Sequence, residues 1–130
     1  MANKTICASP EAFQGILAEA LATNPGKVFC LFTGAKNSGT NVSWCPDCTR
    51  AEPVIDGVLA ERPEVTLIEA IVERAAYRDA NYLYRTDAKI KLKCVPTLMR
   101  WNASAAMSLD DKQSSDAVLV RELFDTVNDD

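Results

Sequence analysis

The spacing of apolar residues predicts a helix followed by a buried strand in the first third of the chain. Ser9-Pro10-Glu11 combines a side-chain cap, a proline suited to a first turn and an acidic residue, so it predicts a helix start. Helical spacing then continues through Phe13, Ile16, Leu17, Ala20 and Leu21. Asn24-Pro25-Gly26 predicts the end of this helix, and the apolar run over residues 28–32 predicts a central strand.

The middle of the chain predicts a loop, a second helix and a second strand. Residues 33–43 are rich in Gly, Asn, Ser and Thr, which is typical of a loop. A helix should follow and end at Arg62-Pro63, with Pro53 inside it. Its apolar side should carry Ala51, Val54, Ile55, Val58 and Leu59. Residues 65–72 are mostly apolar and predict a second buried strand.

The last third predicts a helix over residues 79–89, a hairpin and a final helix. The arms of the hairpin are residues 97–101 and 107–109, around Asn102-Ala103-Ser104. Ser115 or Asp116 should cap the final helix, whose core-facing residues are Leu119, Leu123, Phe124 and Val127. Alternation of helices and strands predicts an α/β sandwich with a mixed sheet. No repeat or linker interrupts the chain, so residues 1–130 should form one domain.

The composition favours a folded protein that binds neither nucleic acid nor membranes. Hydrophobic residues make up 48% of the chain, and its formal net charge of −4 disfavours anionic partners. No stretch approaches the about 20 apolar residues of a membrane span. Residues 1–14 lack the basic and apolar regions of a secretory signal, so we expect a cytoplasmic location.

The cysteine and histidine content narrows the possible chemistry. The chain has 5 cysteines, an odd number that fits a secreted disulfide framework poorly. It has 0 histidines, which excludes Cys–His and Ser–His catalysis and removes the commonest zinc ligand.

Cys45 and Cys48 are spaced Cys-x-x-Cys at the predicted start of the second helix. Unsatisfied N–H groups and the positive end of a helix stabilise a thiolate at such a position, so we expect Cys45 to be exposed and to attack a disulfide. Pro46 suits the first helical turn. Cys48 lies one turn further in, where it can attack the mixed disulfide and release the substrate as a thiol.

The same pair has two other interpretations. A structural zinc site needs a second pair of ligands, and Cys7, Cys30 and Cys94 are too scattered to supply one, so we expect no metal. The pair could also be inert and buried.

Three neighbours of the pair each have a functional and a structural interpretation. Trp44 could shape a docking surface beside the disulfide or be a half-buried aromatic without a role. Asp47 could tune the Cys45 thiolate, which a carboxylate disfavours, or only stabilise the first helical turn. Glu52 lies on the same helix face as Cys48, so it could accept the proton that Cys48 loses or be solvated.

Several motifs together resemble the thioredoxin superfamily: Trp44-Cys45-Pro46-Asp47-Cys48, Pro53 and Val95-Pro96-Thr97. The resemblance implies a thioredoxin fold, with a central mixed β-sheet flanked by helices on both faces. It also implies that the Val95–Pro96 bond is cis. Pro96 would pack against the active-site cysteines and help present a backbone edge to the substrate.

The match narrows to the thioredoxin-related 14-kDa proteins, also called the Clot group. It rests on Phe32-Thr33-Gly34, Ser43-Trp44-Cys45-Pro46-Asp47-Cys48, Ala51-Glu52-Pro53-Val54 and Cys94-Val95-Pro96-Thr97-Leu98. The resemblance implies a cytosolic disulfide reductase with a narrower target range than thioredoxin. In animals the electrons of this group come from NADPH through thioredoxin reductase.

Two cysteines depart from what the resemblance implies. Ordinary thioredoxins carry a buried acid on the strand before the active site, and our alignment places Cys30 there. Cys94 is an addition to the family pattern. We expect it near the active site, too far from Cys45 for a disulfide, and dispensable.

The sequence therefore predicts a monomeric thiol–disulfide oxidoreductase. Its substrates would be disulfide-containing proteins or small disulfides. Thioredoxin reductase or a low-molecular-weight dithiol would restore its dithiol, and no bound organic cofactor is needed. The alternative is a redox-dependent binding or regulatory protein with little turnover.

Overall fold

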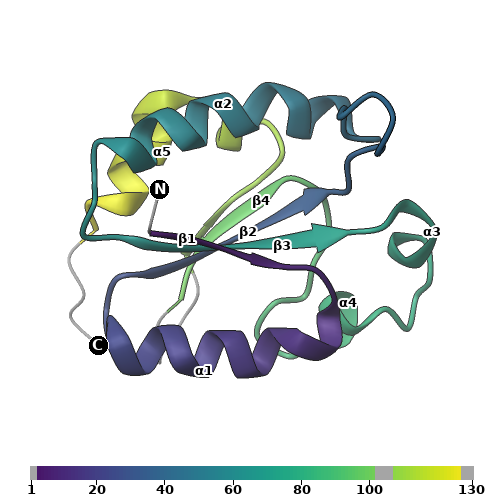
Figure 1. Cartoon of the computed structure of the whole chain (residues 1–130), viewed down its shortest axis with the longest axis horizontal. Coiled ribbons are helices and arrows are strands. Elements are labelled where there is room, and N and C mark those ends of the chain that lie inside the picture. The colour runs from purple at the N-terminus through teal and green to yellow at the C-terminus, as the bar shows by residue number, and fades with distance from the viewer. Residues whose placement is uncertain (1–2, 102–106, 127–130) are drawn as a thin grey trace.

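A five-stranded mixed sheet lies at the centre of the structure, a computed structural model that describes residues 3–101 and 107–126 (Figure 1). The strands are β1 (Lys4–Cys7), β2 (Val28–Gly34), β3 (Thr66–Val72), β4 (Thr97–Arg100) and β5 (Met107–Leu109). The α-helices are α1 (Phe13–Thr23), α2 (Pro46–Ala60), α3 (Arg74–Tyr77), α4 (Leu83–Thr86) and α5 (Ala117–Phe124). Short 3-10 helices span Pro10–Ala12 and Gln113–Ser115.

The strand order β1-β3-β2-β4-β5 combines parallel and antiparallel pairs. β3 runs parallel to both β1 and β2, whereas β4 runs antiparallel to β2 and β5. The pairing of Phe32 with Thr97 places the end of β2 beside the start of β4. This register brings the segment that leads into α2 next to Pro96, although the two are far apart in sequence.

Helices cover both faces of the sheet, with α1 on one side and α2 and α5 on the other (Figure 1). The side chains of β2 alternate between the two faces, and every residue of the strand is buried. Beneath α1 lies a cluster that includes Phe13, Leu17, Cys30, Phe32 and Met99. Beneath α2 and α5 lies a second cluster that includes Phe29, Leu31, Ile55, Leu98 and Leu123.

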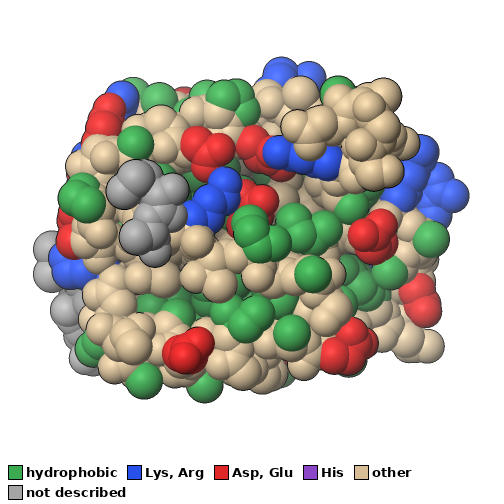
Figure 2. Space-filling view, in the orientation of Figure 1, with side chains coloured by type: hydrophobic (Ala, Val, Ile, Leu, Met, Phe, Trp, Pro, Cys, Tyr) green, Lys and Arg blue, Asp and Glu red, His purple; other side chains and the backbone are tan. Residues whose placement is uncertain are grey.

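The expected α/β architecture is confirmed, but the sequence pattern missed β1. Only Cys7 of this strand is buried, and Ile6 is 53% exposed. Figure 1 labels this edge strand, and Figure 2 shows the surface of the molecule in the same orientation. A short strand with one buried residue has no clear periodicity. Its strand character comes from pairing with the distant β3.

The helix predicted over residues 79–89 is wrong, because this segment contains only the single turn α4. Side-chain oxygens compete for the backbone donors on either side of that turn. Asp79 Oδ1 accepts from the Asn81 N–H at 2.9 Å, and Asp87 Oδ1 accepts from the N–H groups of Lys89 and Ile90. The chain therefore turns before and after α4.

The first helix starts differently from the prediction, whereas the start of the last helix matches one of the two predicted caps. Ser9 makes no side-chain cap, and the first helix starts as the 3-10 turn Pro10–Ala12. Asp116, rather than Ser115, caps α5 by accepting from two backbone N–H groups. Leu119 is half-buried, whereas the neighbouring Val120 is fully buried. Val127 and the hairpin turn at 102–104 lie outside the described residues.

Candidate active site

Cys45 is the N-cap residue of α2, in an extended conformation with φ −109° and ψ 111°. Its Sγ accepts a hydrogen bond from the Cys48 N–H at 3.2 Å, one of the donors that a helix start leaves unsatisfied. Pro46 follows at the first helical position, where its missing N–H costs nothing. The sulfur therefore lies at the positive end of the helix, where a thiolate is favoured.

The Cys45 side chain is enclosed more than the sequence predicted. Only 5% of the residue is exposed, so the expectation of an exposed cysteine is wrong. The Cys45 N–H donates to Ser43 Oγ at 3.1 Å, and the Cys45 thiol donates to the Val95 carbonyl at 3.4 Å. The Val95 carbonyl thus contacts the sulfur, while Ser43 holds the backbone of the same residue.

The Val95–Pro96 peptide bond is cis, which confirms the expectation from the resemblance. Both residues are buried. The Val95 carbonyl reaches the Cys45 thiol directly, so the segment before β4 forms one wall of the site.

Cys48 lies one turn deeper and is fully buried. Burial is the main factor that raises the pKa of its thiol to about 12, and the hydrogen bond with Cys45 adds to that effect. The Gly34 N–H donates to Cys48 Sγ at 3.3 Å and acts in the opposite direction. The Cys48 thiol is therefore protonated at neutral pH.

The segment between β2 and α2 is an ordered turn that closes on itself. Lys36 and Ser43 form an isolated antiparallel bridge, and the Asn37 N–H donates to the Val42 carbonyl at 2.9 Å. Ser43 Oγ donates to the Gly34 carbonyl at 2.9 Å. The predicted loop over residues 33–43 thus begins two residues too early, because β2 continues through Gly34.

Trp44 is anchored against the end of β3. Its Nε1–H donates to the Val72 carbonyl at 2.9 Å, and its ring lies 5.6 Å from that of Tyr77. The Arg74 guanidinium lies 6.0 Å from the indole ring. The half-buried Trp44 therefore fixes the chain just before Cys45.

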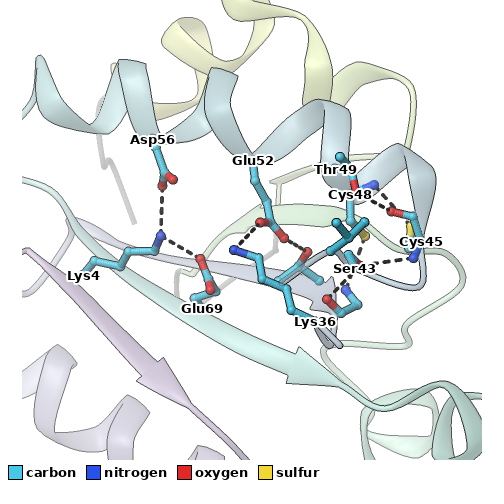
Figure 3. A network of polar contacts seen from close by, with 12 residues as sticks. Lys4, Lys36, Ser43, Cys45, Cys48, Thr49, Glu52, Asp56 and Glu69 are labelled. Carbon is cyan, nitrogen blue, oxygen red and sulfur yellow. Dashed lines mark hydrogen bonds and ion pairs between the residues drawn. The ribbon is translucent and has the colours of Figure 1, made fainter. Parts of the chain in front are cut away.

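Asp47 and Glu52 lie on different sides of α2 and have different partners. Asp47 forms an ion pair with Arg50 at the exposed start of the helix. Glu52 is 9% exposed, and its Oε2 accepts from the Thr33 hydroxyl at 2.5 Å. Its Oε1 lies 3.2 Å from Lys36 Nζ. Glu52 thus joins the buried Thr33 to the exposed Lys36, and this polar group extends the site beyond the two cysteines. Figure 3 shows the Glu52–Lys36 pair beside Cys48 and Cys45.

Comparison with known proteins assigns the fold and family of this site. Residues 9–126 match the family model of the thioredoxin domain of thioredoxin domain-containing protein 17-like proteins. The chain belongs to this family. The thioredoxin-like protein Clot of Arabidopsis thaliana is 39% identical over 120 residues, which cover 88% of this chain and 90% of that protein. Human thioredoxin domain-containing protein 17 is 34% identical, with coverage of 78% and 80%.

A solved structure confirms the thioredoxin fold that the resemblance implied. The X-ray structure of Fasciola hepatica thioredoxin superposes with a TM-score of 0.60 and 16% sequence identity. The match covers 92% of this chain and 95% of that one. Membership in a thioredoxin-like family indicates an oxidoreductase with a redox role, and thioredoxins in general act on disulfides.

The remaining cysteines of this thioredoxin-like domain lie outside the helix start. Cys30 packs in the sheet core, and burial strongly raises the pKa of its thiol. Its neighbour Leu31 faces the cluster beneath α2, so Cys30 points to the opposite face of the sheet from Glu52. A buried acid is instead present one helical turn after Cys48, where Glu52 accepts from the Thr33 hydroxyl.

Cys94 is half-buried beside a cavity of about 310 Å³ that also contacts β4 and β5. Its Sγ lies 3.5 Å from Thr97 Oγ1 and 4.0 Å from the Pro96 carbonyl. Cys7 is fully buried, and its Sγ lies 3.7 Å from the Tyr84 hydroxyl.

Sequence reasoning identified Glu52 but missed Thr33 and Lys36 as its partners. Thr33 is 1% exposed at the end of a fully buried strand, where an isolated hydroxyl needs a partner. The position of Thr33 in an apolar strand could therefore have indicated a polar partner for it. Nothing in the sequence distinguished Lys36 from the other polar residues of its loop.

The described residues offer neither a metal-site cluster nor a membrane-spanning helix. Within residues 3–101 and 107–126, no cluster of three or more His, Cys, Asp or Glu side chains has the arrangement of a metal site. Over the same part of the chain, no helix combines the length and apolar character that a membrane span requires.

The geometry predicts that Cys45 reacts with an alkylating agent before Cys48 does. Cys48 has no exposed surface and is protonated at neutral pH, whereas Cys45 retains some exposure at a helix start. Limited alkylation of the reduced protein at pH 7, followed by fragmentation of the peptide that carries both cysteines, will measure the order. Earlier modification of Cys48 would show that the two roles are reversed.

Proposed function

We propose that this thioredoxin-like domain is a thiol–disulfide oxidoreductase that reduces disulfides through Cys45 and Cys48. One observation carries the proposal. The Cys45 sulfur lies at the start of α2 and accepts from the Cys48 N–H, while the Cys48 thiol is held protonated directly behind it. This arrangement provides an attacking thiol, Cys45, and a resolving thiol, Cys48, in the same helical turn.

In the first step, the Cys45 thiolate attacks one sulfur of a substrate disulfide. The new S–S bond joins Cys45 to the substrate, and the second substrate sulfur leaves as a thiolate that takes up a proton. The backbone donor at Cys48 favours the attacking thiolate. Ser43 and Val95 position Cys45 from both sides.

In the second step, Cys48 loses its proton and its thiolate attacks Cys45 Sγ. The Cys45–substrate bond breaks, a disulfide forms between Cys45 and Cys48, and the substrate leaves as a thiol. The attack is fast because it is intramolecular and both cysteines belong to one helical turn.

The reaction needs a disulfide substrate and an external source of two electrons. The proposed substrates are disulfide-containing proteins or small disulfides. Thioredoxin reductase or a low-molecular-weight dithiol would convert the oxidised pair back to two thiols. We propose that the protein works as a monomer of one domain in the cytoplasm, without a metal or bound organic cofactor.

Turnover tests this proposal against the alternative of a redox-dependent binding protein. The purified protein is mixed with a small disulfide and a catalytic amount of thioredoxin reductase with NADPH, and separately with a dithiol. Many moles of disulfide reduced per mole of protein, with either reductant, are expected. A single oxidation of the protein without turnover in both assays would favour the binding function.

Cys94→Ala should retain most of the reductase activity. Cys94 Sγ contacts Thr97 and the Pro96 carbonyl, and its thiol is unnecessary for either proposed step. The turnover assay above measures the effect, with thermal unfolding as the check on folding. A folded Cys94→Ala protein that had lost activity as completely as a Cys48 variant would require a mechanism with three thiols.

A further inference from the structure

The resolving step requires a proton acceptor for Cys48, because its thiol is fully buried and protonated at neutral pH. Buried Glu52 lies one helical turn further along α2. No hydrogen bond joins Glu52 directly to Cys48 among the described contacts, so a third group has to connect them. This inference rests on the proposed function.

We propose that the Thr33 hydroxyl relays the proton of Cys48 to the Glu52 carboxylate. The Thr33 hydroxyl donates to Glu52 Oε2 at 2.5 Å, and both side chains are buried between β2 and α2. The next residue, Gly34, donates its N–H to Cys48 Sγ at 3.3 Å. The end of β2 thus contacts the thiol through one residue and the carboxylate through its neighbour.

The electrostatics of Cys48 agree with this placement. A hydrogen bond from the Thr33 side chain is one of the influences that lower the pKa of the Cys48 thiol, against the larger effect of burial. Together with the Gly34 contact to Cys48 Sγ and the Thr33–Glu52 hydrogen bond, this influence supports a hydroxyl placed between the sulfur and the carboxylate.

In this relay two protons move, and each crosses a single hydrogen bond. The Cys48 S–H transfers its proton to Thr33 Oγ1 while the original hydroxyl proton moves to Glu52 Oε2. Cys48 becomes a thiolate, Glu52 becomes neutral and Thr33 is again a hydroxyl, now donating to the sulfur. The thiolate then attacks the mixed disulfide, and Glu52 later returns its proton to solvent or to the departing thiolate.

Lys36 orients the acceptor for this transfer. Its ammonium lies 3.2 Å from Glu52 Oε1, which leaves Oε2 directed at Thr33. Lys36 belongs to the turn between β2 and α2, and its side chain is 46% exposed. A partner that docks on this turn would therefore contact a residue that positions the proton acceptor.

The other charged groups near Glu52 form a separate network (Figure 3). Asp56 follows one turn later on α2, and Glu69 faces it from β3. Lys4 of β1 binds both carboxylates, at 2.9 Å and 2.8 Å. Burial alone would lower the pKa of Lys4, but its hydrogen bonds and charge attraction to Glu69 and Asp56 raise it. Lys4 therefore stays charged and offsets the negative charge of these two carboxylates. Figure 2 shows acidic and basic side chains together in this region beneath α2.

A symmetric aromatic disulfide with a coloured thiol product separates the two chemical steps. Attack by Cys45 releases the first coloured thiol, and attack by Cys48 releases the second. All proteins carry Cys94→Ala, so that this half-buried thiol does not react with the reagent. Stopped-flow measurement across pH 6–10 gives each rate separately.

Thr33→Val should slow the second release by roughly 10²-fold at pH 7, within the range of general acid–base catalysis, and leave the first release unchanged. The second rate should then rise with pH more steeply than in the parent protein, because hydroxide must remove the proton. Thr33→Ser should restore the rate and the profile. Glu52→Gln should reproduce the Thr33→Val phenotype.

Thr49→Val is the matched control. Thr49 lies next to Cys48 in sequence, but its hydroxyl donates to the Cys45 carbonyl and not to Glu52. Both releases should keep their parent rates in this variant. A folded Thr33→Val protein with an unchanged second rate and pH profile would overturn the relay. Absence of either release in the parent protein would instead refute the proposed function.

Discussion

Cys45→Ser is expected to show no disulfide reduction above the blank, whereas Cys48→Ser should stop after the first step with the substrate still attached. A serine hydroxyl at position 45 cannot form the mixed disulfide. In Cys48→Ser that bond forms, but an external thiol must resolve it. An oriented intramolecular nucleophile corresponds to an effective concentration of about 10⁵ M or more, so its loss makes resolution very slow.

Mass spectrometry of the intact protein, together with the turnover assay, checks both expectations. Cys48→Ser should gain the mass of one substrate half and release it on addition of a reductant. Cys45→Ser should gain no such mass at position 48. A stable adduct on Cys48 in the Cys45→Ser protein, at the rate of the parent, would mean that Cys48 is the nucleophile.

Gly34→Ala is expected to destabilise the protein and impair the site at the same time. A Cβ atom at this position would lie 2.7 Å from Ser43 Oγ and 3.0 Å from both Cys45 Cβ and Trp44 Cε2. Separations this short require the segment before α2 to move. Overpacking of this kind costs about 1–3 kcal/mol of unfolding free energy.

The activity of Gly34→Ala should fall further than its stability suggests. Gly34 donates to Cys48 Sγ and accepts from Ser43, so a shift of its backbone displaces both thiols. A displacement of about 1 Å at a reacting centre can cost about 10²-fold in rate. Urea unfolding and the turnover assay measure the two effects separately.

Gly57→Ala in α2 provides the control for this substitution. No heavy atom lies within 4 Å of a Cβ built at Gly57, and alanine is favoured over glycine in a helix by up to about 1 kcal/mol. This variant should be at least as stable as the parent and equally active. Equal stability and activity in Gly34→Ala would show that the turn before α2 accommodates a side chain without moving.

The local sequence determined the main helices, the central strands and the site of the chemistry. Turn residues and caps bounded the elements, as with Asn24-Pro25-Gly26 after α1 and Asp116 before α5. Continuous apolar runs revealed β2 and β3 because both strands are buried on two faces. The spacing of Cys45 and Cys48 at a helix start was readable in the same way, although their roles in the reaction remain a prediction.

Tertiary structure alone decided which distant groups meet. β1 is a strand because it pairs with β3, and the short turn α4 is set by side-chain hydrogen bonds rather than by a helical pattern. The enclosure of Cys45 depends on the Val95 carbonyl, 50 residues away in sequence. Glu52 acquired its partners Thr33 and Lys36 only when α2 packed across the end of β2. Periodicity and capping act within a few residues, whereas strand pairing and the burial of polar groups join segments that the sequence keeps apart.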